Sequence, residues 1–325
     1  MGVRFLSTGV GLPDRVLTNA DLSKMVDTSD DWITERTGIK ERRIAAPEEA
    51  TSDLSARAAR QALERAGVAA EDVDLVVVAT CTPDHLFPST ACLVQKSLGL
   101  TKAVAFDVSA ACSGFLYGLA VVNGLLETGV ARTALLIGAD TLSRFTDWTD
   151  RSTCVLFGDG AGALLLRAVE GPGDLLSVHT GSEGAAGDVL CIPGGGSRHP
   201  AGAGAVPKHP AFIKMDGREV FKHAVARMIE AANTALAKAG KKPSDLKLLI
   251  PHQANLRIID AIAKRVDIPN ERVFRNVQKF GNMSAATTIV ALDEAVGDGR
   301  VQRGDLVELI AFGAGLTWGA AVLRW

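Results

Sequence analysis

The stretch that decides the fold is Ala103-Val-Ala-Phe-Asp-Val-Ser-Ala-Ala-Cys112-Ser-Gly-Phe-Leu-Tyr-Gly-Leu119. Its first half is apolar and predicts a buried strand, and its second half has the spacing of a helix. Cys112 therefore lies where a strand turns into a helix. Backbone N–H groups and the positive end of the helix dipole at such a position favour thiolate over thiol. A buried structural cysteine is the alternative interpretation.

Composition places the chain among ordinary globular proteins. It has 325 residues, of which 47% are hydrophobic and 22% charged, enough for two domains or one large duplicated domain. The net charge of −2 implies no general affinity for nucleic acid or membranes. Neither a secretory signal nor a membrane-spanning stretch is recognisable in the sequence. We therefore expect a cytoplasmic protein.

Cysteine and histidine usage argues against disulfides and metals. The five cysteines are odd in number and lack CxxC spacing, so neither a disulfide framework nor a zinc site is indicated. The six histidines are scattered without the spacing of metal ligands. We expect no metal and no cofactor in a reducing compartment.

Apolar strand-like runs alternate with amphipathic helical runs, which is the pattern of an α/β protein. Buried strands are predicted over residues 75–79, 104–108, 134–137, 246–250 and 306–310. Helices are predicted over residues 52–66, 113–128, 217–239, 255–265 and 284–296. Residues 181–211, rich in glycine, proline and alanine, predict loops over a site or at a domain seam.

The chain repeats itself weakly but in order. Residues 74–80 resemble 245–251, the run before Cys112 resembles Phe274-Arg-Asn-Val277, and residues 162–167 resemble 319–324. Two equivalent halves, residues 1–170 and 171–325, would place Cys112 and Asn282 at related strand–turn–helix corners. Unrelated apolar strands can give a similar appearance.

Two further polar residues follow predicted strands. His252 lies in Pro251-His-Gln-Ala-Asn255, and Asn282 lies in Phe280-Gly-Asn-Met-Ser-Ala-Ala286, each just before a helix. Taken singly, a core histidine and a capping asparagine are the ordinary interpretations. Together with Cys112 they form three polar groups at strand ends of a duplicated sheet, where ligands usually bind.

These motifs, with Phe157-Gly-Asp-Gly-Ala-Gly162 and Phe312-Gly-Ala-Gly-Leu-Thr-Trp-Gly319, extend over the whole chain. Because it has all of these motifs together, the chain resembles the β-ketoacyl-acyl-carrier-protein synthases III, which are condensing enzymes of the thiolase superfamily. The resemblance implies a thiolase-like duplicated five-layer αβαβα fold in the α/β class, with two similar halves, and a homodimer. The implied partners are acyl-CoA, as a substrate, and malonyl-acyl-carrier protein.

The resemblance also implies roles for residues. Cys112 would carry the acyl group, and His252 and Asn282 would hold the thioester oxygen during decarboxylation. The backbone N–H groups of Cys112 and Ala314 would form the oxyanion hole. This chain has Gly313-Ala314-Gly315 where the family more commonly has Gly-Gly-Gly. If the backbone at Ala314 had a positive φ, the alanine would cost roughly 1–2 kcal/mol in strain.

The remaining site residues are implied in groups. Trp32 and Arg36 share a helix face, where the indole would stack on an adenine and the guanidinium would pair with a phosphate. The full CoA-binding group is Thr28, Trp32, Arg36, Arg151, Gly217, Phe221 and Asn255. The acyl pocket is expected to include Phe87, Leu142, Phe157 and Ile213, with Phe87 reaching into the partner's site. The surface that binds the carrier protein is expected to include Lys222, Arg257 and Lys264. Core packing and solvated helix faces are the ordinary alternatives for these residues.

The predicted function is decarboxylative condensation of a short acyl-CoA, most simply acetyl-CoA, with malonyl-acyl-carrier protein to start fatty-acid synthesis. A same-family enzyme of secondary metabolism, or one using longer or branched primers, is the near alternative. A non-catalytic partner subunit is disfavoured because Cys112, His252 and Asn282 are all present. A hydrolase built on the same thiol would give free acid and no new C–C bond.

Overall fold

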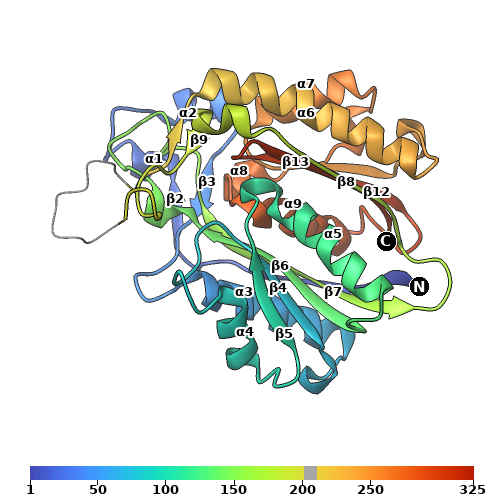
Figure 1. The fold of residues 1–325 in the computed structure, drawn as a ribbon. Helices are drawn as coiled ribbons and strands as arrows, with labels where there is room; N and C mark the ends of the chain where they lie inside the picture. The colour runs from blue at the N-terminus through green and yellow to red at the C-terminus, as the bar shows by residue number, and fades with distance from the viewer. Residues whose placement is uncertain (201–210) are drawn as a thin grey trace.

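The computed structural model describes residues 1–200 and 211–325 as five stacked layers (Figure 1). From one face to the other these layers are helices, sheet, helices, sheet and helices. Helices α3 and α4 cover one outer face, α6 and α7 cover the other, and α5 and α9 lie between the two sheets. The predicted five-layer αβαβα architecture is confirmed.

The first sheet has strand order β1-β7-β6-β4-β5. Strand β4 pairs in parallel with β5 and β6, whereas β7 runs antiparallel to both β6 and β1. The strands are β1 (Gly2–Gly11), β4 (Leu75–Ala79), β5 (Val104–Val108), β6 (Thr133–Thr141) and β7 (Asp159–Val169). Two short strands, β2 (Val16–Thr18) and β3 (Glu41–Arg43), form a separate antiparallel pair.

The second sheet repeats this order as β11-β12-β13-β8. Strands β11 and β12 are parallel, and β13 is antiparallel to both β12 and β8, as in the first sheet. The isolated parallel bridge between Leu249 and Val273 stands where β5 stands in the first sheet. The strands are β8 (Leu175–Ser182), β11 (Leu248–Pro251), β12 (Leu306–Gly313) and β13 (Thr317–Arg324). Strands β9 (Leu190–Cys191) and β10 (Lys214–Met215) pair apart from it.

The helices are α1 (Asn19–Leu22), α2 (Asp30–Thr37), α3 (Thr51–Ala66), α4 (Thr90–Leu98), α5 (Gly114–Glu127), α6 (Gly217–Lys238), α7 (Leu256–Arg265), α8 (Val277–Phe280) and α9 (Thr287–Gly297). The five predicted helical ranges correspond to α3, α5, α6, α7 and α9, whereas α1, α4 and α8 were not predicted. Helix α2 begins after the Ser29 cap and ends at Gly38, which has a φ of 76°. None of the helices formed by the described residues is long and apolar enough to cross a membrane.

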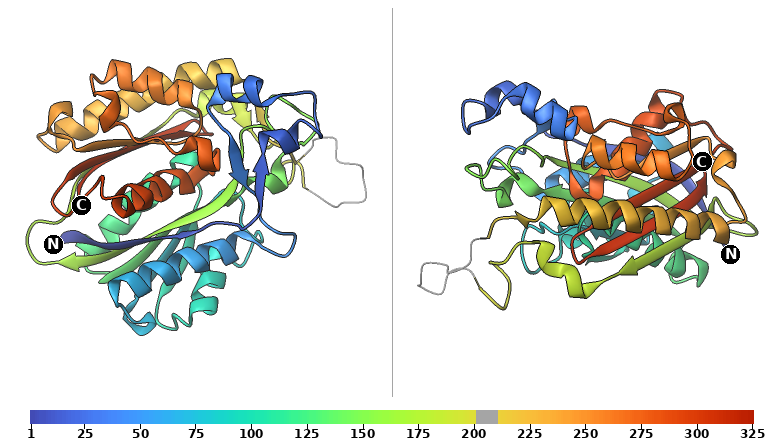
Figure 2. Two further views of the ribbon diagram at one scale, coloured as in Figure 1. Left: turned by 180° about the vertical axis from the view of Figure 1, so that it is seen from behind. Right: turned by 90° about the horizontal axis from the view of Figure 1, so that it is seen from above.

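The two central helices are apolar because both sheets press on them. Phe115, Leu116 and Leu119 of α5 and Ile289 and Leu292 of α9 are fully buried in one cluster that includes strands of both sheets. Helices that contact a sheet on two sides need little polar surface, although Val121 of α5 is 39% exposed. Their N-termini point to the same end of the molecule, where the candidate site lies. Helix α6 lies along the outer face of the second sheet (Figure 2).

The segment from Leu17 to Ile44 packs against the later part of the chain. Leu17, Leu22, Ile33 and Ile39 belong to the same buried cluster as residues of α6, α7 and β12. Fully buried Arg42 ties this segment down. The Arg42 guanidinium donates to Leu17 O at 3.2 Å, to Asn19 Oδ1 at 2.9 Å and to Val155 O at 2.7 Å.

Candidate active site

Cys112 lies at a sharp turn between β5 and α5. The 3-10 turn η2 (Ala111–Ser113) leads into α5, and Ala111 has the left-handed φ of 44°. Ser113 holds the turn by donating from N and Oγ to Ala110 O at 3.2 and 2.9 Å, and its Oγ also contacts Thr317 Oγ1 at 2.8 Å. The turn presents the thiol at the start of a buried helix, as the sequence predicts.

The end of β12 comes unusually close to the backbone of Cys112. A Cβ placed on Gly313 would lie 2.6 Å from Cys112 N and 3.1 Å from Ser113 N. Only glycine therefore leaves room for a substrate oxygen beside this amide. Ala314, the next residue, is absent from the non-glycine residues with positive φ, which are Ala111, Asp267 and Ser284 within the described chain. The strain considered for Ala314 does not arise.

His252 follows β11 and is held by a threonine. Its Nδ1 lies 2.5 Å from Thr287 Oγ1, the first residue of α9, and both side chains are buried. Burial lowers the pKa of His252 to about 3, so the ring is neutral at physiological pH. A neutral imidazole has one N–H donor and one acceptor nitrogen.

Asn282 is fixed by both its backbone and its amide. Its N donates to Leu156 O at 2.9 Å and its O accepts from Gly158 N at 3.0 Å, forming a parallel bridge beside Phe157. The side-chain Oδ1 accepts from Ser284 N at 2.8 Å. The Nδ2 group is therefore free to donate into the site.

Burial opposes the thiolate that the helix end was expected to favour. It raises the pKa of Cys112 to about 12, and the nearby Asp140 carboxylate adds to the shift. Hydrogen bonds from the Ser284 and Asn282 side chains act in the opposite direction. Desolvation thus favours the neutral thiol at rest and opposes the effect expected of the helix end.

The three residues line one hollow. Cys112, His252 and Asn282 border a cavity of about 140 Å3 together with the predicted residues Phe157, Gly217, Phe221 and Asn255. A second, mostly apolar hollow of about 480 Å3 begins at Cys112 and is bordered by Leu142, Phe157, Ile213 and Ala314. Sequence reasoning missed Cys81 and Ser284, which also border the second hollow.

The predicted CoA residues on α2 form a separate group of stacked side chains. The Arg36 and Arg151 guanidinium carbons lie 4.5 and 4.9 Å from the centroid of the Trp32 ring. Arg151 also donates to Asp27 O at 2.9 Å. This group meets the channel through Asn255, whose Nδ2 donates to Arg36 O at 3.1 Å. Thr28 lies just before α2, and its buried hydroxyl has no hydrogen-bond partner in residues 1–200 and 211–325.

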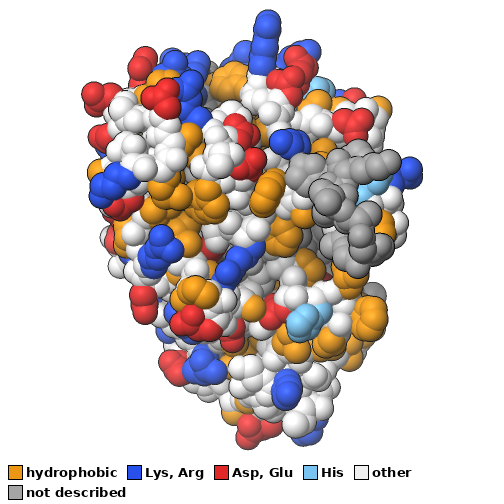
Figure 3. Space-filling view, turned by 90° about the vertical axis from the view of Figure 1, so that its left-hand side faces the viewer, with side chains coloured by type: hydrophobic (Ala, Val, Ile, Leu, Met, Phe, Trp, Pro, Cys, Tyr) orange, Lys and Arg blue, Asp and Glu red, His pale blue; other side chains and the backbone are white. Residues whose placement is uncertain are grey.

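The predicted docking cations lie on the surface around α6 and α7. Lys222 pairs with Glu219 at 3.5 Å, whereas Arg257 and Lys264 are exposed and form no ion pair with any described residue. Figure 3 views the molecule from the left-hand side of Figure 1. On this face lysine and arginine side chains are interspersed with hydrophobic ones.

Phe87 borders neither hollow of its own chain. Its side chain is 84% exposed on the loop before α4, next to Leu86 at 87%.

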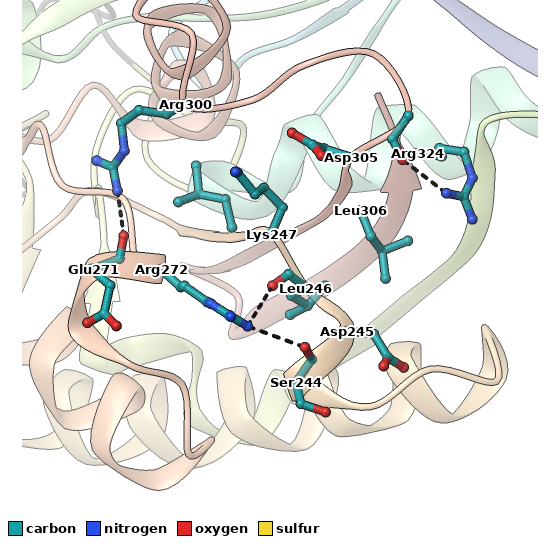
Figure 4. Close-up of a pocket in the computed structure, with 12 residues that line it drawn as sticks. Ser244, Asp245, Leu246, Lys247, Glu271, Arg272, Arg300, Asp305, Leu306 and Arg324 are labelled. Carbon is teal, nitrogen blue, oxygen red and sulfur yellow. Dashed lines mark hydrogen bonds between the residues drawn. The ribbon is translucent and has the colours of Figure 1, made fainter.

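A larger hollow of about 660 Å3 lies at the other end of the second sheet (Figure 4). It opens where β11 and β12 begin, whereas His252 and Gly313 stand at or after their ends. Arg272, Arg300 and Arg324 border it and donate to main-chain carbonyls. Aspartates and glutamates alternate with these cations, so no single charge dominates it. No described group of three or more His, Cys, Asp or Glu side chains is placed to hold a metal ion.

Models of known families match two parts of the chain. Residues 106–184 match the 3-oxoacyl-[acyl-carrier-protein] synthase III model, and residues 236–325 match its C-terminal model. A β-ketoacyl-[acyl-carrier-protein] synthase III from Desulfitobacterium hafniense is 54% identical over 325 residues, which cover 100% of this chain and 98% of the relative. One from Caldanaerobacter subterraneus is 53% identical over 320 residues, covering 98% and 97% of the two chains. The chain belongs to the β-ketoacyl-acyl-carrier-protein synthase III family.

Solved structures of the family share its fold throughout. The Aquifex aeolicus 3-oxoacyl-[acyl-carrier-protein] synthase III has a TM-score of 0.92 and 49% identity, and each chain is covered completely. The priming β-ketosynthase of the R1128 polyketide pathway has a TM-score of 0.94 and 36% identity, with 99% of this chain and 96% of that chain covered. The predicted family, fold and enzyme class are therefore confirmed.

Proposed function

We propose that this synthase joins a short acyl group from acyl-CoA, most simply acetyl-CoA, to malonyl-acyl-carrier protein. The product is a 3-oxoacyl-acyl-carrier protein, and the reaction starts fatty-acid synthesis in the cytoplasm. The observation that carries the proposal is that Cys112, His252 and Asn282, from three distant segments, border one hollow. Such a hollow excludes water, and its donors point where negative charge develops.

In the first half-reaction Cys112 takes the acyl group. Its sulfur attacks the thioester carbonyl, the C–S bond to CoA breaks, and the thiol proton ends on the departing CoA sulfur. Exchange of one thioester for another is nearly balanced in free energy, so the barrier is the main obstacle. The amides of Cys112 and Ala314 stabilise the tetrahedral oxyanion, and the closeness of Gly313 keeps that place open. Ser284 and Asn282 favour the thiolate at the moment of attack.

In the second half-reaction malonyl-acyl-carrier protein loses CO2. The electron pair of the breaking C–C bond passes into an enolate whose charge lies on the thioester oxygen. The ring N–H of His252 and the free amide NH2 of Asn282 hold that oxygen, and asparagine does so without titrating. The carbanion then attacks the Cys112 thioester, and the Cys112 sulfur leaves as the new C–C bond forms.

We also propose that the enzyme acts as a homodimer. Strand β5 is the edge of the first sheet and leaves Val104 58% exposed. The loop carrying exposed Leu86 and Phe87 lies beside it, because Asp107 of β5 accepts from Thr90 N and Ala91 N at 2.7 and 2.8 Å. An unpaired apolar edge of this kind suits a second copy, into whose site Phe87 would reach.

A second candidate function follows from the size of the apolar hollow. In it, the enzyme uses a longer or branched acyl-CoA primer, or acts in secondary metabolism. Its volume is about 480 Å3. The three non-hydrogen atoms of an acetyl group need at most on the order of 90 Å3 if each takes the volume of a water molecule. Each further methylene contributes only about 1–3 kcal/mol of discrimination, so the hollow alone does not choose the primer.

The test is condensation measured with a panel of acyl-CoA primers and malonyl-acyl-carrier protein, with mass spectrometry of Cys112 after each primer alone. The proposal expects an acylated Cys112 and a 3-oxoacyl product with acetyl-CoA. A strong preference for primers well beyond four carbons would instead support the second candidate. Free acid without a new C–C bond would identify a hydrolase, and an unmodified Cys112 would refute the enzymatic role.

A further inference from the structure

Asp140 is a fully buried carboxylate near the end of β6 whose described partners are all hydrogen-bond donors. Its Oδ1 accepts from Thr80 Oγ1 at 3.0 Å, from Cys81 N and Sγ at 2.8 and 3.3 Å, and from Thr82 N and Oγ1 at 3.1 and 2.9 Å. Its Oδ2 accepts from Ala285 N at 3.3 Å. No lysine, arginine or histidine of residues 1–200 and 211–325 forms an ion pair with it, so these donors offset the cost of burying the charge.

The donors come from two segments that are far apart in the sequence. Residues 80–82 directly follow β4, whereas Ala285 lies in the 3-10 turn η7 (Ser284–Ala286), which leads from Asn282 into α9. The consecutive amides of Ser284 and Ala285 donate to Asn282 Oδ1 and to Asp140 Oδ2. One short turn therefore connects the Asn282 side chain to the Asp140 carboxylate.

The start of α5, which follows Cys112, packs against both of these segments. A Cβ placed on Gly114, the first residue of α5, would lie 3.3 Å from Ala79 Cβ and 3.6 Å from Ala285 Cβ. Ala79 is the last residue of β4, and the donors to Asp140 Oδ1 follow it directly. Asp140 therefore joins the two segments against which the Cys112 turn is packed.

Strand β6 also contacts η7 closely at Gly138. A Cβ on Gly138 would lie 2.5 Å from Ala285 O, so only glycine allows this approach. Gly138 and Asp140 are two positions apart and face the same side of the strand. Cys81 Sγ, which donates to Asp140, also lies 3.9 Å from Ser284 Oγ. Packing at Gly138 and hydrogen bonds at Asp140 thus hold the same turn.

We infer that Asp140 is a positioning residue that fixes the η7 turn relative to the Cys112 turn, and so fixes the distance between Cys112 and Asn282. The inference rests on the proposed function, in which the enolate formed beside Asn282 attacks the acyl group on Cys112. That attack needs the reacting carbons about 3–3.5 Å apart. An enolate that lies too far away takes a proton from water instead. Malonyl-acyl-carrier protein then gives CO2 and acetyl-acyl-carrier protein, no C–C bond forms, and the acyl group stays on Cys112.

The chain provides an isosteric variant and a matched control. Asp140→Asn keeps one oxygen for the donors that follow β4 and turns its NH2 group toward Ala285 N, so two donors face each other and η7 is displaced. Asp159→Asn is the control, because Asp159 is equally buried and accepts from Ser143 N and Ala45 N at 2.9 and 2.7 Å. Neither of these two partners borders either hollow of the site.

The first readout is the ratio of CO2 released to 3-oxoacyl product formed, with acetyl-CoA and 13C-labelled malonyl-acyl-carrier protein. The wild-type protein and Asp159→Asn are expected to release one CO2 for each product. Asp140→Asn should release about two or more, with labelled acetyl-acyl-carrier protein as the difference. Its kcat for condensation should fall about tenfold or more, within the about 10²-fold loss for a misplacement near 1 Å, and KM should change much less.

This ratio distinguishes positioning from stability, because a loss of folded protein lowers CO2 release and product formation equally. A ratio of one in Asp140→Asn would overturn the inference, and so would an equal rise in Asp159→Asn. A wild-type protein that releases no CO2 and forms no product would instead refute the proposed function.

The second readout is hydrogen exchange at the Ala285 amide, which needs neither substrate nor a variant. In the wild-type protein this amide should exchange as slowly as those of β6, because its hydrogen bond opens only when η7 leaves the buried carboxylate. Exchange should be faster in Asp140→Asn and unchanged in Asp159→Asn. Fast exchange at Ala285 in the wild-type protein would overturn the inference, whatever the outcome for the proposed function.

Discussion

Replacing Gly313 by alanine is expected to slow acyl transfer about a hundredfold. The added methyl group would lie 2.6 Å from Cys112 N, and an ordinary contact needs at least 3.4 Å. One side must therefore move by about 0.8 Å. The turn at Cys112 resists, because Ser113 is bonded to Ala110 and Thr317. A misplacement near 1 Å costs about 10²-fold in rate, and loss of one oxyanion donor costs a similar or larger factor.

The assay is single-turnover acylation of Cys112 by saturating acetyl-CoA, with quenched samples analysed by mass spectrometry. Saturation separates the chemical step from the binding of the acyl-CoA. Gly124→Ala is the matched control, because the position lies in α5 with no atom within 4 Å of the added Cβ. It should acylate at the wild-type rate and unfold at the same or a slightly higher temperature. Wild-type acylation by Gly313→Ala would refute the argument from close approach.

Three further results are expected. Cys112→Ala should abolish acyl transfer but keep part of the decarboxylation of malonyl-acyl-carrier protein, measured as CO2 release. If His252→Ala decarboxylated at the wild-type rate, the assignment of decarboxylation to His252 would be contradicted. Arg257→Glu should raise KM for malonyl-acyl-carrier protein and leave acylation from acetyl-CoA nearly unchanged, whereas equal loss of both would refute the docking role. Glu308→Gln should raise the unfolding temperature relative to wild type by an amount that grows between about pH 5 and pH 8, and a constant difference would contradict it.

The sign for Glu308 follows from its burial. Both carboxyl oxygens are buried and have no hydrogen-bond partner among the described residues, and burial raises the pKa of Glu308 well above its usual range. The folded protein then keeps this proton while the unfolded chain releases it above about pH 4.5. Stability contributed by this group is therefore lost as the pH rises above that value. Glutamine has the same shape and does not ionise, so its advantage increases with pH.

Much of the fold was predictable because hydrophobic periodicity, and the residues that begin and end strands and helices, are local properties of the sequence. The apolar runs at residues 75–79 and 306–310 lie within β4 and β12. The weak internal repeat predicted two similar halves, and the two sheets do repeat one strand order, although the sequence predicted no strand order. These predictions needed only neighbouring residues and their order.

What failed or was missed depends on distant neighbours. Burial raises the pKa of Cys112, and an argument from the helix end alone does not contain that contribution. Thr287 contacts a histidine 35 residues away, and nothing in its own surroundings in the sequence signals that contact. Arg42, in a short stretch of charged residues, is fully buried although arginine is mostly exposed in proteins.

The burial of Arg42 limits how a nucleotide would reach Trp32, the ring that the family resemblance assigns to adenine. Three neutral oxygens surround the guanidinium, and moving it out of place would strand a cation that even in this interior has a pKa of about 10. Its partner Asn19 donates to Asp30 Oδ1 and Ile39 O, at the two ends of α2. Helix α2 is thereby held at both ends. The Arg151 side chain above Trp32, by contrast, is bonded to the main chain of Asp27, which lies in an exposed segment. We expect adenine to enter by swinging Arg151 aside over a stationary helix, so that the docking surface for CoA is rigid on one side and hinged on the other.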